Sequence, residues 1–262
     1  MAIELTENER IDEVNEHLSL IQRKDGLVFG TDALLLAAYV ARKAPRVAEF
    51  GAGCGIVSLL LLRRDKAEHV TAVEVQEDYA RLTARNAELN GLSDRLTSVA
   101  CDLRVFSQTH REAFDLIVAN PPYMKADSGY LCREDAKTVA RHEIHGHIGE
   151  WCEAAARSLR YGGYFVSVYR PDRLTDLLCA MRTAGLEPKR MTFVQADATA
   201  APSMVLVLCK RGGASGVTLT RPLLLHQDAA HTHPGDDMQY ILDFGSFPKN
   251  FFDAPKKRKE SV

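Results

Sequence analysis

The 262-residue sequence lacks an apolar run long enough to cross a membrane. Apolar stretches such as Ala33 to Val40 and Ile56 to Leu62 fall far short of the roughly 20 residues that a spanning helix requires. The acidic first segment, MAIELTENERIDEV, also lacks the apolar core of a signal peptide. We therefore expect a protein that is neither exported nor held in a membrane.

The sequence has no C-x-x-C pair of the kind that metal and redox sites use. Its six cysteines are scattered at positions 54, 101, 132, 152, 179 and 209, a pattern typical of reduced thiols in the cytoplasm. Histidines gather at positions 142, 145 and 147 and at positions 231 and 233. Their offsets suit neither one helix face nor a zinc finger, so we expect no metal site.

An excess of basic residues is also missing, since the formal net charge is -2 and the isoelectric point is about 6.5. The overall field of a dedicated nucleic-acid binder is therefore absent, and any contact with RNA must use local patches. The candidate patches are Arg23-Lys24, Arg42-Lys43, Lys125, Arg133, Lys137, Arg141 and the tail Lys256-Lys257-Arg258-Lys259.

What the sequence does contain is a regular alternation of strand-like and helix-like segments. Strands are expected near residues 46–50, 70–75, 96–100, 114–119, 163–169, 189–195 and 203–210. Helices are expected near residues 31–42, 55–64, 77–90, 148–160 and 172–184, with Gly91, Gly162 and Gly185 as stops. This order predicts an α/β fold with a mostly parallel seven-stranded sheet, helices on both faces and an antiparallel last strand.

The most informative motif is Asn120-Pro121-Pro122-Tyr123, which follows the apolar strand Phe114 to Ala119. Proline restricts its own backbone and that of the residue before it, so Asn120 and Pro121 are held extended with free carbonyl groups. The Asn120 side-chain oxygen and the Pro121 carbonyl are two acceptors for the protons of a planar amino group, which becomes nucleophilic as its nitrogen turns tetrahedral. Tyr123 would stack on the ring that carries this amino group. The motif predicts an amino-group methylation site.

A second motif predicts the methyl donor. Gly51, Gly53 and Gly55 follow the strand that ends at Phe50, and glycines at a strand-to-helix turn let a ligand approach the backbone. Glu74 lies about 20 residues further on, the usual place for a carboxylate that binds ribose hydroxyls. A nicotinamide enzyme would use the same logic, but its third glycine would come one position later. The spacing therefore favours S-adenosylmethionine.

Asp102 follows the strand at residues 96–100 and is expected near the adenine amino group of the donor, although an ordinary turn aspartate is also possible. The carboxyl ends of parallel strands meet at one edge of a sheet, where ligands bind. Gly51, Glu74, Asp102 and Asn120 each follow or end such a strand. We expect them to converge.

In this order the segments EFGAGCG, VEV, CD and FDLIVANPPY resemble the class I S-adenosylmethionine-dependent methyltransferases of the small-domain type. Among these, the chain is most similar to the bacterial tRNA(Val) adenine-37 N(6)-methyltransferase group. The upstream segment QRKDGLVFGTDALLL, from Gln22 to Leu36, and the downstream Ala140-Arg141-His142 extend the similarity. It covers roughly residues 20 to 228 and implies a Rossmann-like catalytic domain at residues 21–228, an N-terminal extension at 1–20 and a C-terminal extension at 229–262.

The resemblance implies roles for individual residues. The donor site would comprise Thr31, Asp32, Glu49, Gly51, Gly53, Gly55, Glu74, Asp102 and Asn120, with Thr31 and Asp32 at the methionine end. The catalytic residues would be Asn120, Pro121 and Tyr123. The substrate would contact Pro122, Tyr123, Lys125, Arg141 and His142. Thr31 or Asp32 also suits the start of the helix that follows.

The implied activity is methylation of an adenine amino group in RNA, with adenosine 37 of a tRNA anticodon loop as the expected target. A methyltransferase acting on rRNA guanine or on a release-factor glutamine, and a non-catalytic donor-binding protein, remain as alternatives. A DNA enzyme would need a separate target-reading domain, which the length does not provide. The segment His231 to Asp236 departs from the Tyr-Thr-Glu signal expected after the last strand, so the RNA target stays open.

Overall fold

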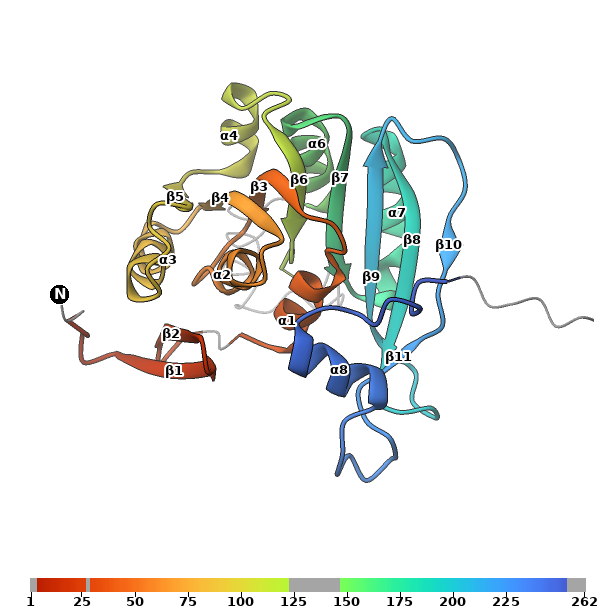
Figure 1. Ribbon diagram of the computed structural model, residues 1–262. Coiled ribbons are helices and arrows are strands. Elements are labelled where there is room, and N and C mark those ends of the chain that lie inside the picture. Colours follow the sequence, from red (N-terminus) through yellow and green to blue (C-terminus); the bar gives the residue numbers. More distant parts are fainter. Residues whose placement is uncertain (1–3, 27–28, 123–146, 254–262) are drawn as a thin grey trace, which may run out of the picture.

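The computed structural model describes residues 4–26, 29–122 and 147–253, which form a central sheet with helices on both faces (Figure 1). The strands are β1 (Glu9–Asn15), β2 (Leu18–Arg23), β3 (Ala44–Phe50), β4 (Ala67–Glu74), β5 (Leu96–Ala100), β6 (Phe114–Ala119), β7 (Leu159–Tyr169), β8 (Leu186–Gln195), β9 (Pro202–Arg211), β10 (Thr218–Leu219) and β11 (Leu223–Leu224). The helices are α1 (Thr31–Tyr39), α2 (Ile56–Arg63), α3 (Glu77–Leu89), α4 (Leu103–Thr109), α6 (Ile148–Ser158), the 3-10 turn η1 (Pro171–Arg173), α7 (Leu174–Thr183) and α8 (Asp236–Phe244).

The main sheet has the strand order β10-β8-β9-β7-β6-β3-β4-β5, and β11 also pairs with β8. Strands β5, β4, β3, β6 and β7 are parallel to one another, whereas β9 runs antiparallel to both of its neighbours, β7 and β8. The predicted mostly parallel sheet with an antiparallel last long strand is therefore confirmed. The two-residue strands β10 and β11 enlarge it from the expected seven strands to nine.

The core lies on both faces of the sheet because apolar residues occupy successive positions along the central strands. On β6, Leu116 and Val118 pack into one cluster with α1, α2 and α8, while Ile117 and Ala119 pack into the other with α4, α6 and α7. Strands buried on both faces are expected to read as continuous apolar runs, as β6 does. This double burial holds the carboxyl ends of the strands in a rigid row.

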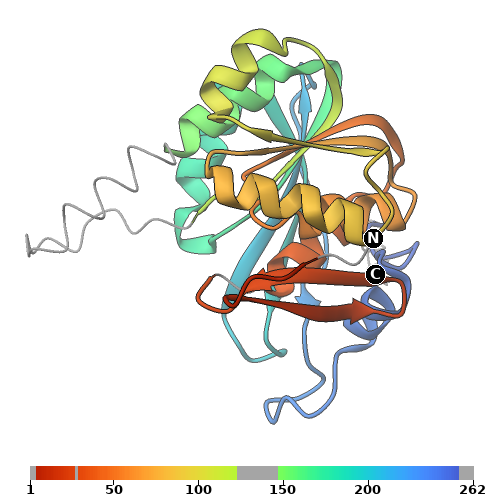
Figure 2. The same ribbon diagram turned by 90° about the vertical axis from the view of Figure 1, so that its left-hand side faces the viewer.

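The N-terminal segment forms a hairpin that the sequence analysis did not predict. Strands β1 and β2 pair antiparallel, and the hairpin lies beside α3 (Figure 2). Asn86 of α3 accepts from the Ile21 amide at 2.6 Å and donates to the Ile21 carbonyl at 3.1 Å, and Asn90 makes the same pair of contacts with Ser19. The side-chain amides thus act as a further strand for β2, and the expected domain boundary at residue 20 falls inside this strand.

The C-terminal segment packs against α1 and against the residue that precedes β4. Phe247 and Phe251 are buried, and Phe247 contacts Tyr39 of α1 edge-to-face at 5.5 Å between ring centroids. Lys66 donates to the carbonyls of Ala37 and Ala38 at the end of α1 and to that of Gly245 at the end of α8, all within 3.0 Å. Burial lowers the pKa of Lys66 to about 7. The predicted basic tail lies outside the described residues.

Two local expectations differ from the structure. Helix α6 ends at Ser158 and passes directly into β7, so Gly162 is a positive-φ position inside that strand and the prediction of a helix stop there was wrong. Helix α4 was not predicted because its seven residues are too few to show a clear helical period. Across the described ranges, no helix is long and apolar enough to span a bilayer.

Candidate active site

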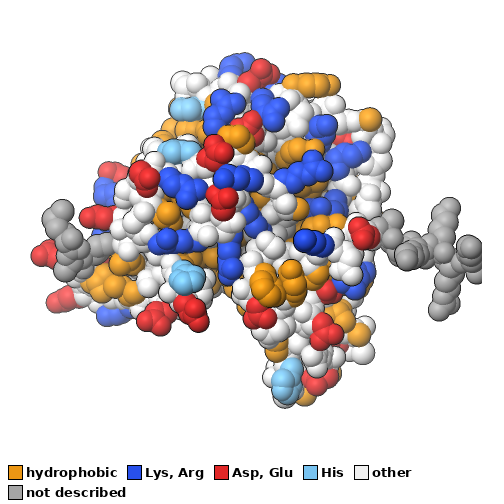
Figure 3. Space-filling view, viewed as in Figure 1, with side chains coloured by type: hydrophobic (Ala, Val, Ile, Leu, Met, Phe, Trp, Pro, Cys, Tyr) orange, Lys and Arg blue, Asp and Glu red, His pale blue; other side chains and the backbone are white. Residues whose placement is uncertain are grey.

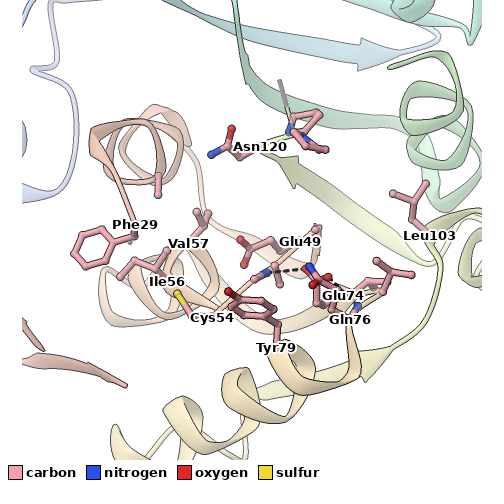
Figure 4. A pocket seen from close by; sticks show the side chains of 18 of the residues that line it. Phe29, Glu49, Cys54, Ile56, Val57, Glu74, Gln76, Tyr79, Leu103 and Asn120 are labelled. Carbon is pink, nitrogen blue, oxygen red and sulfur yellow. Dashed lines mark hydrogen bonds between the residues drawn. The ribbon is translucent and has the colours of Figure 1, made fainter. Parts of the chain in front are cut away.

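The carboxyl ends of β3, β4, β5 and β6 border one cavity of about 550 Å³. Gly51, Glu74, Asp102 and Asn120 all line it, as their positions after successive parallel strands predicted. Figure 4 shows Asn120 across the cavity from Glu49 and Glu74. The topology therefore brings Gly51 and Asn120, which are 69 positions apart in the sequence, to the same cavity.

The turn after β3 needs glycine at two positions, because the backbone there has a positive φ and a neighbouring side chain leaves no room for a Cβ. Gly51 has φ +70°, and a Cβ there would lie 2.7 Å from the Trp151 ring. Gly55 has φ +84°, and a Cβ there would lie 2.7 Å from Thr83. Gly55 is buried beneath the turn and is not among the lining residues, so it shapes the turn without bordering the cavity.

Glu74, at the end of β4, is buried and already accepts two backbone hydrogen bonds. Its Oε2 accepts from the Gly53 amide and its Oε1 from the Gln76 amide, both at 2.9 Å. An ionised carboxylate can accept about four hydrogen bonds, so each oxygen can still accept one further hydrogen bond. The arrangement ties the carboxylate to the glycine turn and suits it to a pair of ribose hydroxyls.

Glu49, at the end of β3, lines the cavity with a side chain that is only 4% exposed. Its Oε2 accepts from both the backbone amide, at 2.9 Å, and the hydroxyl of Ser58. Burial, with a smaller contribution from the neighbouring Glu74, raises the pKa of Glu49 to about 8 against the lowering effect of Ser58. The raised pKa therefore favours the protonated form of this carboxyl group near neutral pH.

Asp102 caps α4, accepting from the Arg104 amide at 2.7 Å. The Arg104 guanidinium also donates to both carboxylate oxygens of Asp102, with its Nε 3.0 Å from each. Another nitrogen of the same guanidinium donates to Glu150 Oε1 at 3.3 Å. The hydrogen bonds to Arg104 hold the pKa of Asp102 below its usual range. Asp102 lines the cavity, as its position after β5 predicted, whereas its contact with Arg104 was not predicted. The only signal for that contact is the place of Arg104 two residues later, on an unpredicted helix.

Asn120 follows β6 and is joined to α1 by a direct contact. Its Nδ2 donates to Asp32 Oδ2 at 2.7 Å, while Asp32 Oδ1 accepts from the Ala33 amide at 2.9 Å. Pro121 and Pro122 continue the rim of the cavity. Asp32 was expected at the methionine end of the donor, and its bond to Asn120 is an additional contact that the sequence did not indicate.

Other expected residues are placed differently or cannot be placed. Thr31 is the first residue of α1 but does not line the cavity, and Gly30 rather than Thr31 or Asp32 is the N-cap. Tyr123, Lys125, Arg141 and His142 lie outside the described residues. Within the described part of the chain, no group of three histidine, cysteine or acidic side chains could hold a metal ion.

Three aromatic side chains complete the cavity walls and were not predicted as site residues. Phe29 precedes α1, Tyr79 lies on α3, and Trp151 lies on α6 over Gly51. Trp151 is the only tryptophan of the chain, which is the one signal that could have drawn attention to it. Carboxylates at the strand ends and aromatic walls between them form a cavity suited to a ligand with both polar and ring portions.

Comparison with known proteins agrees with this geometry. The family model described as methyltransferase small domain matches residues 23–172, more than half of the chain. A tRNA1(Val) (adenine(37)-N6)-methyltransferase from Haemophilus influenzae is 30% identical over 183 residues, which cover 65% of this chain and 78% of the relative. The enzyme of that name from Aeromonas hydrophila is 30% identical over 70% of this chain and 76% of its own length.

Among solved structures, the chain is similar to an Agrobacterium tumefaciens protein described as a predicted O-methyltransferase. The TM-score is 0.65 at 26% sequence identity, and the match covers 82% of this chain and 96% of the other. The family match, the relatives and the shared fold all agree. The chain therefore belongs to the methyltransferase small-domain family and is an S-adenosylmethionine-dependent methyltransferase.

Proposed function

We propose that this enzyme methylates the exocyclic amino group of an adenine in RNA, and that adenosine 37 of a tRNA anticodon loop is the target. The observation that carries the proposal is the position of Asn120 and Pro121 on the rim of the cavity that also contains the glycine turn and Glu74. The names of the relatives from Haemophilus influenzae and Aeromonas hydrophila support the choice of nucleotide. Residues 21–228 form the catalytic unit in this proposal.

The cavity fits the donor by size and by chemistry. Its volume of about 550 Å³ lies within the roughly 300–1,000 Å³ of small-molecule sites. Glu74 would accept from the ribose hydroxyls, Asp102 would lie near the adenine, and the backbone of Gly51 and Gly53 would allow close approach. When bound, S-adenosylmethionine supplies a methyl carbon activated by a positively charged sulfur.

The chain's own residues would orient and activate the acceptor nitrogen. The Asn120 side-chain oxygen and the Pro121 carbonyl would accept the two amino protons, which draws the nitrogen lone pair out of the ring and towards the methyl carbon. Holding the nitrogen in line with that carbon supplies most of the remaining effect, because alignment replaces a bimolecular encounter. Tyr123, Arg141 and His142 stay as predicted substrate contacts.

An amino target is favoured over a hydroxyl target by the number of acceptors. Two acceptors on one rim match the two protons of an NH₂ group, whereas a hydroxyl has a single proton. The Agrobacterium tumefaciens structure, described as a predicted O-methyltransferase, makes a hydroxyl the second candidate. Methyl transfer to ribose or to a small-molecule hydroxyl would be the signature of that candidate.

Contact with RNA would rely on local charge. Figure 3 shows Lys and Arg side chains gathered on the upper part of one face, with Asp and Glu among them. Some of the described arginines are already ion-paired, as Arg46 and Arg160 are with Asp115. RNA affinity should therefore fall with added salt in proportion to the small number of phosphates that the remaining cations neutralise.

The test is to incubate the purified protein with labelled S-adenosylmethionine and bulk RNA from a strain that lacks the gene, and to identify the labelled nucleoside. DNA, release factor and small-molecule hydroxyl acceptors serve as parallel substrates. N6-methyladenosine at position 37 of a tRNA supports the proposal. Label in another nucleoside, in protein or in a hydroxyl, or no label at all, overturns it.

Site variants separate the two halves of the cavity. Asn120→Ala should nearly abolish transfer while donor binding stays within a few fold, whereas Glu74→Ala should weaken donor binding itself. Asn250→Ala, at an exposed position, is the matched control for loss of one amide side chain. Equal loss of donor affinity in the Asn120 and Glu74 variants would refute this division of roles.

A further inference from the structure

The hydrogen bond between Asp32 and Asn120 joins residues 88 positions apart at the rim of the cavity. Asp32 is held in place because its other oxygen accepts from the Ala33 amide in the first turn of α1. Asn120 is held by the strand end before it and by Pro121 after it. Both partners are therefore anchored to rigid elements, and their 2.7 Å contact has a defined geometry.

This contact determines which end of the Asn120 amide faces α1. The two ends of an asparagine amide have nearly the same shape but opposite hydrogen-bonding character, since the NH₂ donates and the oxygen accepts. An ionised carboxylate can only accept, so it pairs with the NH₂ end and repels the oxygen. The Asp32 carboxylate therefore favours the orientation in which the NH₂ end faces α1. An amide turned by half a turn would present a donor where the reaction needs an acceptor.

We propose that Asp32 is a positioning residue that locks the Asn120 amide with its oxygen towards the substrate, so that the site selects a base carrying an amino group over one carrying a carbonyl. This inference rests on the proposed function, because it assigns the source of that function's selectivity. The relevant pair of bases is adenine, with an NH₂ at the ring position in question, and hypoxanthine, with an oxygen there. A fixed acceptor binds the first and repels the second.

The experiment uses Asp32→Asn in the full-length protein, which keeps the size of the side chain but lets either end of each amide face the other. Asp94→Asn, at an exposed position, is the matched control for loss of one carboxylate. The probes are S-adenosylmethionine alone and an RNA anticodon stem–loop with adenosine or inosine at position 37. RNA binding is measured in the presence of S-adenosylhomocysteine, so that no turnover occurs.

The expected result for Asp32→Asn is a fall in kcat of roughly 10- to 100-fold, the scale of a misplaced catalytic group. The kcat is measured at saturating S-adenosylmethionine, so that a change in donor affinity does not enter it. The preference for adenosine over inosine should fall severalfold, and the part that remains comes from the Pro121 carbonyl, which still accepts one amino proton. The double variant with Asn120→Ala should be no slower than Asn120→Ala alone, because residues that act as a unit are not additive. The Asp94→Asn control should match the wild type in all these measurements.

A second variant tests the same idea by rescue. Asn120→Asp alone places two carboxylates against each other, whereas Asn120→Asp combined with Asp32→Asn exchanges the partners and restores one donor and one acceptor. The exchanged protein keeps a carboxylate oxygen towards the substrate, so its kcat should exceed that of Asn120→Asp alone by at least about tenfold, the size of one charge-assisted contact. Folding of each variant is checked by its unfolding midpoint.

Several outcomes would overturn the role of Asp32. They are wild-type kcat in Asp32→Asn, a preference for adenosine over inosine equal to that of the wild type, and an exchanged variant no faster than Asn120→Asp alone. A loss of donor affinity above tenfold with selectivity retained would place Asp32 in the donor site instead. If the wild-type enzyme does not methylate the adenosine stem–loop, the proposed function itself has failed, which is a separate result.

Discussion

Glu49→Gln should make the stability of the donor-free protein less sensitive to pH. The pKa of Glu49 is raised from 4.5 to about 8 by burial, so between these pH values the folded chain keeps a proton that the unfolded chain has released. Stability must then fall as pH rises through this window, because the unfolded state binds fewer protons. The glutamine variant keeps an acceptor for Ser58 but has no proton to release.

The size of the effect follows from the shift. A difference of one pKa unit corresponds to about 1.4 kcal/mol, so the shift of Glu49 sets a ceiling of about 5 kcal/mol on the stability lost by pH 8. This is a large fraction of the 5–15 kcal/mol that typically separates folded from unfolded domains. The variant should therefore be close to the wild type at pH 5 and more stable than it at pH 8.5.

Urea unfolding at both pH values, followed by the fluorescence of the single, buried Trp151, measures the difference directly. Lys66 titrates in the opposite sense, since its lowered pKa makes stability rise with pH above about 7, but it is present in both proteins and cancels in the comparison. A wild-type-to-variant difference that is the same at pH 5 and pH 8.5 would refute a raised pKa for Glu49.

Two further changes test how the terminal segments are attached. Asn86→Ala removes the hydrogen-bond partners of the Ile21 amide, the Ile21 carbonyl and the Cys54 carbonyl. It should therefore lower the free energy of unfolding, measured by urea titration, by about 3 kcal/mol. A loss below about 0.5 kcal/mol would contradict the role of this side-chain amide. Lys66→Met leaves the carbonyls of Ala37, Ala38 and Gly245 without their donor. It should also remove the rise in stability between pH 7 and 10.5, measured by thermal unfolding at a series of pH values. An unchanged dependence of stability on pH would show that Lys66 does not cause this rise.

The order of motifs along the chain was enough to predict the main sheet and four of the residues that line the cavity. Strand-like runs followed by Gly51, Glu74, Asp102 and Asn120 imply convergence, because parallel strands deliver their carboxyl ends to one edge. This inference needs only local pattern and topology. The hairpin β1–β2 was not predicted in this way, because its strand β2 is held by the side chains of Asn86 and Asn90 at the end of α3.

Local sequence was enough to predict the seven long strands of the main sheet, the glycine turn and the rigid Asn-Pro-Pro rim, because a short run of neighbouring residues indicates each of them. Only the tertiary structure decided that Asp32 bonds to Asn120, that Arg104 links Asp102 to Glu150, and that Trp151 lies over Gly51. Such contacts depend on where helices dock on the sheet, which is a property of the packed core and not of any short stretch of chain.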